Sequence, residues 1–427
     1  MATSSTAKAP NSPRTLLIIL LIVYIFNFLD RQIVNILAEP IRMDLGLSDT
    51  QIGLMTGLAF ALFYTVLGIP IARYADRPTT SRPKVIALAL AIWSTMTALC
   101  GLAQNFVQLL LARIGVGIGE AGCTPAAHSL IADSVPKERR SRALAFYALG
   151  IPIGTLLGMM IGGFLNDILG WRRAFIVVGL PGILLAGFVL MVLRDPRKSG
   201  LVTQTSDTAK SLGGMETLRA IFGSRALVLL LVAGSTASFL AYGKTTWATI
   251  FFQRTHGLTP GEVGFYFGVV NGLAGAAGTW LGGWLADRFG SVNRRHVLSA
   301  PAIGMAVAVP LQLYAYSAGY WVLGLAVLAI PTVLNSFYYG PTYSSVQGLV
   351  PLRTRAMASA VMLFCQNLIG LGLGPLLFGM LSDTLKPEFG DGSVQVVLYV
   401  ASLMGILPAF FFWRCSLRLN AELDHKD

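Results

Sequence analysis

Charge is the scarcest feature of this sequence. Only 12% of its 427 residues are Asp, Glu, Lys or Arg, whereas soluble domains carry about a quarter. Hydrophobic residues make up 54% of the chain, and its mean hydropathy is +0.66. This composition excludes an ordinary soluble protein and predicts a chain whose main solvent is the lipid bilayer.

Cysteine and histidine are also rare, with four of each. The cysteines lie far apart in apolar segments and form no CxxC pair, so we interpret them as small core residues and predict neither a disulfide framework nor a metal site. The histidines lack metal-ligand spacing, and the sequence has no Gly-x-Ser-x-Gly elbow and no phosphate-binding loop. We therefore expect no enzyme, no cofactor and no bound metal.

The net charge of +12 comes from short basic clusters between long apolar stretches. Because the basic residues form short clusters and not long runs with aromatic residues between them, they do not indicate nucleic-acid binding. Cytoplasmic loops of membrane proteins retain Lys and Arg, and here one set of alternating loops, with both tails, holds 24 of these residues against 5 on the opposite side. We predict a polytopic integral membrane protein with both termini in the cytoplasm, in the inner membrane if the source is bacterial.

Apolar runs long enough to span a bilayer, about 20 residues each, occur twelve times. The fold class predicted is an all-α membrane protein with twelve transmembrane helices in two pseudo-symmetric six-helix bundles. The predicted parts are a tail at 1–14, a bundle at 15–193, a linker at 194–224, a bundle at 225–418 and a tail at 419–427.

An internal repeat supports the two bundles. Gly46–Gly53 parallels Gly257–Gly264, and an Ala-Asp-Arg triplet follows each at the same spacing, ending in Arg77 and Arg288. Both copies begin with a capping box, which satisfies free amides at a helix start. A second match pairs Arg140–Ala145 with Arg353–Ala358. Parallel repeats of this kind in transporters place the substrate near the membrane midplane between the halves.

Several segments carry a family resemblance. Gly283–Gly290, with the sequence GWLADRFG, resembles the loop signature of the major facilitator superfamily, and Ala72–Arg77 resembles its second copy. The chain is also similar to the spinster-like branch of that superfamily, in four segments: Tyr24–Arg31, Arg113–Ala121, Leu130–Asp133 and Arg353–Ala356. The resemblance implies a carrier of lysophospholipids or sphingolipids, in some members coupled to protons. It also places Asp30, Arg31 and Glu120 on the family's positions for an Asp-Arg pair and a Glu.

Charges within the spans support a functional interior independently. Ionisable groups at membrane depth are costly and usually face a wet cavity. Arg113 and Glu120 are seven residues apart and share a helix face, where Gly117 admits a close neighbour. With Asp30 and Arg31 at a compatible depth, the set can form a proton switch. The alternative is a static pair of Arg31 with Glu120 or Asp30, and Arg113 is equally compatible with a structural or a substrate-binding role.

The second half offers further candidate substrate contacts. Lys244 lies within an apolar span, where it either snorkels outward or adds positive charge to the cavity. A polar aromatic stripe of Asn335, Tyr338, Tyr339 and Thr342 either lines an amphipathic ligand's path or makes interhelical hydrogen bonds.

Acidic residues at helix ends are predicted to gate the cytoplasmic side. Asp76 and Asp287 are repeat-related and are expected to face a helix N-terminus of the opposite half. Arg77, Asp133 and Arg288 are the other gating candidates, and the alternative is that all five are ordinary loop charges.

The function predicted is secondary active transport by alternating access, with a small amphipathic lipid and protons as the partners of a monomer in the bilayer. Proton-coupled transport of a sugar, an organic anion or a drug is the nearest alternative. A sensor of the same fold that transports nothing is the other.

Overall fold

The computed structural model describes residues 12–77, 79–199, 221–351 and 354–424. These residues form helices and no strand. The predicted linker and both predicted tails lie partly outside the described residues, and Arg353 lies outside them entirely.

Ten helical runs in the described part of the chain are long and apolar enough to cross a bilayer. One of them, Met357–Leu419, contains two successive membrane-length helical stretches. A further helix, α13 (Pro260–Gly290), has 31 residues and is also long enough, at about 1.5 Å per residue. The predicted all-helical membrane architecture is therefore confirmed.

Two compact units divide the chain. Unit 1 takes the chain up to Leu37 and again from Ala59 into the linker, and unit 2 takes Ala38–Leu58 and the chain beyond the linker. The helices of unit 1 are α1 (Pro13–Ile36), α4 (Ala59–Ala75), α5 (Arg82–Cys100), α6 (Phe106–Glu120), α7 (Cys123–Ser134), α8 (Arg140–Ala148), α9 (Gly150–Leu169) and α10 (Trp171–Val192), with short 3-10 turns at Lys137–Arg139 and Pro196–Ser199.

Unit 2 contains an early segment as well as the C-terminal part of the chain. Its early helices are α2 (Ala38–Leu45), α3 (Asp49–Gly53) and the π-helix η1 (Leu54–Leu58). The later ones are α12 (Arg225–His256), α13, α14 (His296–Ser317), α15 (Trp321–Asn335), α16 (Tyr339–Leu349), α17 (Arg355–Cys365), the π-helix η5 (Gln366–Leu373), α18 (Gly374–Phe389), the 3-10 turn η6 (Gly390–Gly392), α19 (Ser393–Leu403) and α20 (Ile406–Asp424).

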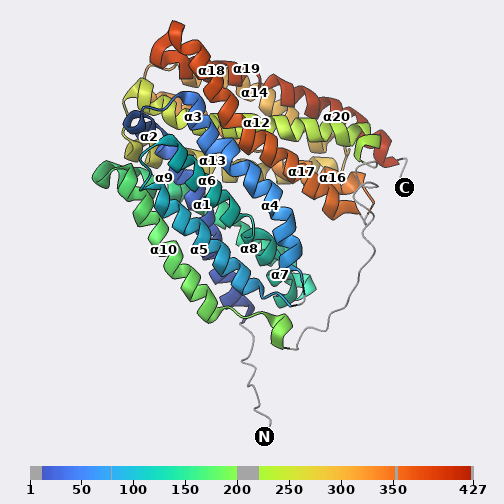
Figure 1. The fold of residues 1–427 in the computed structure, drawn as a ribbon. Coiled ribbons are helices and arrows are strands. Elements are labelled where there is room, and N and C mark those ends of the chain that lie inside the picture. Colours follow the sequence, from blue (N-terminus) through green and yellow to red (C-terminus); the bar gives the residue numbers. More distant parts are fainter. Residues whose placement is uncertain (1–11, 78, 200–220, 352–353, 425–427) are drawn as a thin grey trace. The chain divides into compact units, whose positions relative to one another are not determined.

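Helix α1 is held close to α9 by glycine. A Cβ atom on Gly154 would lie 2.5 Å from the carbonyl oxygen of Ile25, and one on Gly158 would lie 2.8 Å from that of Leu29. The two backbones therefore pack without side chains between them. Figure 1 shows α1, α5, α9 and α10 side by side in unit 1. This packing fixes the part of α1 that carries Asp30 and Arg31.

Both predicted capping boxes are confirmed. The Ser48 hydroxyl accepts a hydrogen bond from the amide of Gln51, whose side chain accepts one from the Ser48 amide. Thr259 and Glu262 make the same reciprocal pair at the start of α13. Each box satisfies amides that the helix itself leaves without partners.

Two predicted transmembrane helices are interrupted near their centres. One breaks into α6 and α7 at Ala121–Gly122, and the other into α15 and α16 at residues 336–338. A proline follows each break, Pro125 four residues after Ala121 and Pro341 four residues after Phe337. Because proline has no N–H, the carbonyl four residues earlier loses its helical partner, which favours a break at that point.

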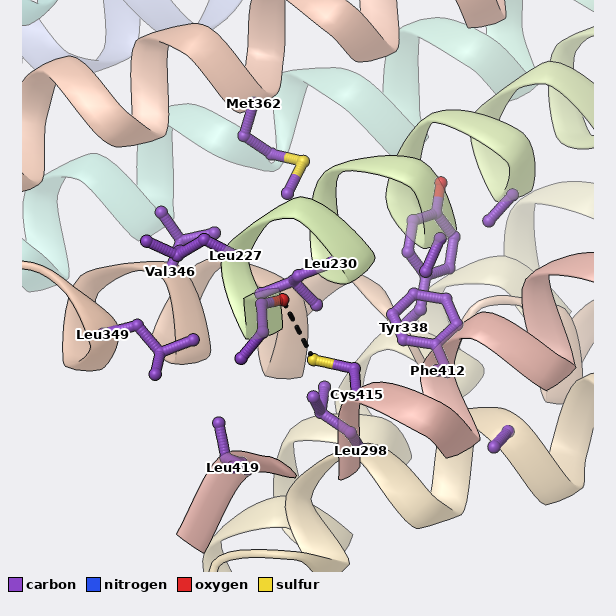
Figure 2. Close-up of a cluster of buried hydrophobic side chains, with 14 of the residues drawn as sticks. Leu227, Leu230, Leu298, Tyr338, Val346, Leu349, Met362, Phe412, Cys415 and Leu419 are labelled. Carbon is purple, nitrogen blue, oxygen red and sulfur yellow. Dashed lines mark hydrogen bonds between the residues drawn. The ribbon is translucent and has the colours of Figure 1, made fainter. Parts of the chain in front are cut away.

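A hydrophobic cluster holds the end of unit 2 together (Figure 2). Phe412 of α20 is fully buried, and its ring lies 5.9 Å from that of Tyr338. Cys415, one turn further on, is also buried, and its thiol donates a hydrogen bond to the carbonyl of Ala226 at 3.3 Å. Helix α20 is therefore anchored on α12 and on the break between α15 and α16.

We predict that Phe412→Ala destabilises the detergent-solubilised protein by about 3–5 kcal/mol, because it removes a buried ring and leaves a cavity. The measurement is the thermal unfolding midpoint. Phe410→Ala on the same helix is the control, since Phe410 is 49% exposed. Equal midpoints for the two variants would contradict the packing described.

Candidate functional site

The centre of unit 1 is an ion pair between α1 and α6. The Arg31 Nε lies 2.6 Å from the Glu120 Oε2, with the Glu120 side chain fully buried and that of Arg31 12% exposed. Of the two pairings left open by the sequence, Arg31 with Glu120 or with Asp30, the structure has the first.

Aromatic rings surround the Arg31 guanidinium. Its Cζ lies 4.5 Å from the ring centroid of Tyr64, 4.9 Å from that of Phe60 and 5.0 Å from that of Phe28. Cations are attracted to the faces of such rings, and more strongly where water is excluded. The rings therefore hold the Arg31 charge next to Glu120.

Asp30 is enclosed beside this pair but takes no part in it. It is 1% exposed, and the Thr97 hydroxyl and the Trp93 indole lie beside its carboxyl without the geometry of an ordinary hydrogen bond. Its strongest electrostatic neighbours are Glu120 and Arg113. Leaving such a group without partners is costly.

Arg113 comes from the same face of α6 as Glu120, as the sequence predicted. It is 1% exposed, and its Cζ lies 5.6 Å from the Phe60 ring. A Cβ on Gly117 would lie 2.7 Å from the Phe60 carbonyl oxygen, and one on Gly119 would lie 2.6 Å from the Trp93 nitrogen. The glycines therefore bring α4 and α5 against the charged face of α6.

Of the predicted substrate contacts in unit 2, some are buried in its interior and others are exposed. Lys244 is buried, and its Nζ donates to the Gln312 Oε1 at 3.0 Å. Tyr338 and Thr342 are buried as well, with the Tyr338 hydroxyl 3.1 Å from that of Ser238. Tyr339 is 37% exposed, and Asn335, at the end of α15, is partly exposed.

The predicted gating residues of unit 1 join a network at the ends of its helices. Asp76 accepts a hydrogen bond from the Ser129 hydroxyl at 3.1 Å. The Asp133 carboxylate accepts from Arg82 at 2.7 Å and from Arg197 at 2.8 Å. Arg77 lies over the ring of Tyr74, with its Cζ 5.6 Å from the centroid.

The repeat-related residues of unit 2 are exposed at the end of α13. Asp287 and Arg288 both lie on its surface. The Arg288 guanidinium stacks over Trp284 at 5.7 Å. The two repeat copies thus differ in their surroundings, although the triplet is the same.

Sequence reasoning missed Arg82 and Asp195. The Arg82 side chain is fully buried and donates hydrogen bonds to both oxygens of Asp195 and to the Ser129 carbonyl. Burial by itself would raise the pKa of Asp195, but the hydrogen bonds and charge of Arg82 outweigh it, so the pKa lies below its ordinary value. The one feature of the sequence that could have indicated this pair is Asp195 itself, an isolated acidic residue at the start of the basic linker.

A second missed cluster ties the early segment to α12 within unit 2. Arg254 pairs with Asp49 at 2.6 Å and with Glu39 at 2.8 Å. Asp383 accepts hydrogen bonds from the amides of Asp49 and Thr50, the first residues of α3. A carboxylate at a helix N-terminus is favourable, since the free amides point towards it. These contacts explain why Ala38–Leu58 belongs to unit 2.

Comparison with known proteins identifies the class. Residues 20–375 match the model of the Major Facilitator Superfamily, and the chain belongs to that family. It is therefore a polytopic integral membrane protein of a transporter family, and not an enzyme.

Its relatives define the branch. It is 35% identical to an MFS-type efflux pump of Mycolicibacterium smegmatis, over 95% of this chain and 93% of the relative, and 25% identical to human protein spinster homolog 1, over 98% and 83%. A bacterial homolog of the human lysosomal transporter spinster, solved in an inward-facing and unoccupied conformation, matches with a TM-score of 0.88 at 29% identity, over 97% and 99%. The predicted spinster-like resemblance is confirmed.

We predict that Asp195→Asn destabilises the protein at neutral pH by about 3–5 kcal/mol, because Arg82 is left buried without its main partner. The folded-state pKa of Asp195 is lowered, so the stabilisation is present above the ordinary value of about 3.9 and is lost as the pH falls through the folded value. The gap in thermal midpoint between wild type and variant should shrink between about pH 7 and about pH 3. The exposed Asp391→Asn serves as control, and a gap that does not change with pH would contradict the assignment.

Proposed function

We propose that this transporter is proton-coupled and moves a lysophospholipid or a sphingolipid-like substrate by alternating access. The observation that carries the coupling is the pair of buried carboxyls in unit 1. Glu120 is engaged by Arg31 at 2.6 Å, and Asp30 lies enclosed beside it without a partner.

The cluster contains acidic and basic side chains in equal number. Two carboxyls and two guanidiniums, Arg31 and Arg113, share one enclosed region of unit 1. In such surroundings, solvent access and the distance to a guanidinium decide whether a carboxyl holds a proton. A conformational change that alters either factor therefore binds or releases a proton, which is what coupling requires.

The alternative, a static pair that locks α1 to α6, is compatible with the Arg31–Glu120 contact alone. It gives no role to Asp30, whose burial is costly and which forms no ion pair with any described residue. Costly buried groups in membrane proteins usually serve a function. The position of Asp30 therefore favours coupling.

The substrate proposal rests on the spinster-like relatives and on the charges available. Arg31, Arg113 and Lys244 are cationic, and a guanidinium can pair a phosphate through two parallel hydrogen bonds. Lys244 has three donors, and Gln312 takes one of them. The exposed Tyr339 lies directly after the break between α15 and α16. Interrupted helices commonly line binding sites in transporters.

A second candidate substrate is a drug-like amphipathic compound. The observation in its favour is the 35% identity to a protein named as an efflux pump. Such a compound would use the same apolar and aromatic surfaces, but a cationic drug would be repelled by the three basic side chains. The two classes are therefore separable by the charge of the ligand.

We also propose that Asp76, Arg77, Asp133, Asp287 and Arg288 control access from the cytoplasm. In this proposal the protein is a monomer with both termini cytoplasmic, in the inner membrane if the source is bacterial. The support is the excess of Lys and Arg on that side and the repeat relation of the two triplets.

For coupling, we predict that a pH gradient stimulates wild-type flux in liposomes and that Glu120→Gln abolishes this stimulation. The variant should still exchange substrate across the membrane without a gradient, because only the proton site is lost. The exposed Glu388→Gln should behave as wild type. If a pH gradient leaves wild-type flux unchanged, the proposal of proton coupling is wrong. If Glu120→Gln loses both exchange and thermal stability, the Arg31–Glu120 pair has a structural role.

For the substrate, we predict saturable binding of anionic lysolipids in a screen that includes sphingoid phosphates, sugars, organic anions and cationic drugs. Lys244→Gln should weaken the binding of an anionic lysolipid by about tenfold or more, the value of one charge-assisted hydrogen bond, and leave an uncharged monoacylglycerol unaffected. The control is the same substitution at the exposed Lys84, Lys84→Gln. Saturable transport of a sugar without lysolipid binding would refute the lipid proposal.

For gating, we predict that Asp76→Asn or Asp287→Asn shifts the population towards the inward-open state by weakening contacts made only when the cytoplasmic side is closed. The measurement is the cross-linking yield between engineered cysteines at the cytoplasmic helix ends. Lower yields are expected in both variants. Yields equal to wild type would refute a gating role for Asp76 and Asp287.

A further inference from the structure

The region around Asp30 contains a concentration of buried polar atoms that the protein itself does not satisfy. They come from three helices of unit 1, namely α1, α5 and α6. The atoms without a hydrogen-bond partner there are Asn27 Nδ2 and Oδ1, Asp30 Oδ1 and Oδ2, Trp93 Nε1, Thr97 Oγ1, Arg113 Nε and one terminal nitrogen, and Glu120 Oε1. Each of these six side chains belongs to a residue that is at most 1% exposed.

These atoms surround one place in the bundle. Thr97 and Trp93 lie beside the Asp30 carboxyl, with Glu120 and Arg113 as its charged neighbours, and Asn27 lies beside Glu120. Within each helix the two residues share one face. They are three positions apart in α1, at 27 and 30, four apart in α5, at 93 and 97, and seven apart in α6, at 113 and 120. Gly119 brings α6 against the backbone of Trp93.

Buried polar groups in proteins are nearly always paired with protein or with ordered water. The mixture of donors and acceptors here decides which ligand fits. A cation would satisfy the carboxyl oxygens and leave the N–H groups of Trp93 and Arg113 without partners, and an anion would do the reverse. Water both donates and accepts, so it alone can satisfy the whole set.

We propose that α1, α5 and α6 enclose a resident water cluster that connects Asp30 to Glu120, and that Asn27, Trp93 and Thr97 are its positioning residues. This inference deepens the proposed coupling site, on which its transport role rests. The Glu120 Oε2 is engaged by Arg31, whereas Oε1 is free to face the cluster.

The cluster gives the proton a path between the two carboxyls. The Asp30 acid donates its proton to a water molecule, and the far end of the water chain donates a proton to the Glu120 Oε1. One proton leaves Asp30 and one arrives at Glu120, so the total charge is unchanged. The charged and titratable groups facing Asp30 are Glu120 and Arg113 of α6 and Cys100 of α5.

The direct test is radiolytic hydroxyl-radical footprinting of the intact wild-type protein in detergent, because radiolysis activates bound water in place. Trp93 and Trp247 are both fully buried. The Trp247 indole already donates to the Pro375 carbonyl at 2.9 Å, so it serves as the matched control. We expect Trp93 to be oxidised several-fold more than Trp247. Equal oxidation of the two would overturn the proposal.

A second test uses two identical substitutions on α5. Thr97→Val removes the hydroxyl beside Asp30, and Thr95→Val removes an exposed one that donates to the Ala91 carbonyl. We expect Thr97→Val to lower Trp93 oxidation at least twofold and to move the pH midpoint of gradient-driven flux by about one unit, the value of one hydrogen bond to a charged group. Thr95→Val should change neither.

These experiments distinguish failure of the water-cluster proposal from failure of the proton-coupling proposal. Strong oxidation of Trp93 in a protein whose flux ignores the pH gradient would support the water site and refute coupling. Gradient-driven flux with equal oxidation of Trp93 and Trp247, and equal behaviour of the two valine variants, would refute the water site and leave coupling standing.

Discussion

The contact between the Arg31 Nε and the Glu120 Oε2 is the interaction on which the rest of unit 1 depends. Each of the two charges offsets part of the cost, several kcal/mol, of burying the other at membrane depth. The surrounding features serve this pair. Glycines 117 and 119 bring neighbouring helices against α6, and three aromatic rings cover the guanidinium. The backbone contact of α1 with α9 fixes the depth at which Arg31 lies.

The two units handle buried charge differently, although the repeat indicates a common origin. Unit 1 places two acids and two arginines together, so the proton affinity of each carboxyl depends on its distance to a guanidinium. Unit 2 buries Lys244 against the neutral amide of Gln312. In our proposal, unit 1 exchanges protons and unit 2 attracts an anionic group. This proposed difference comes from the side chains and not from the repeat, which both halves share.

Hydropathy predicted the membrane architecture because bilayer thickness constrains every span in the same way. The capping boxes and the shared face of Arg113 and Glu120 were predictable for similar reasons, since both follow from local helix geometry. Arg82 was missed because a basic residue between two apolar spans is expected of any membrane protein, and nothing local shows that it is buried on Asp195. The placement of Ala38–Leu58 in unit 2 depends on Arg254 and Asp383, which lie about 200 and 330 positions further along the chain. The break before Tyr339 had a readable signal in Pro341, but proline within a membrane helix does not always interrupt it.

The central claim is that proton occupancy of the Asp30–Glu120 pair is tied to substrate binding. The most direct measurement is the pH change of a weakly buffered detergent solution of the protein when a lysolipid identified by binding is added. The account predicts that wild type takes up or releases protons with saturation at the same concentration as binding, and that Glu120→Gln binds the lipid without a pH change. Saturable binding by wild type with no proton uptake or release at any pH between about 5 and 8, the range in which proteins are generally most stable, would contradict it.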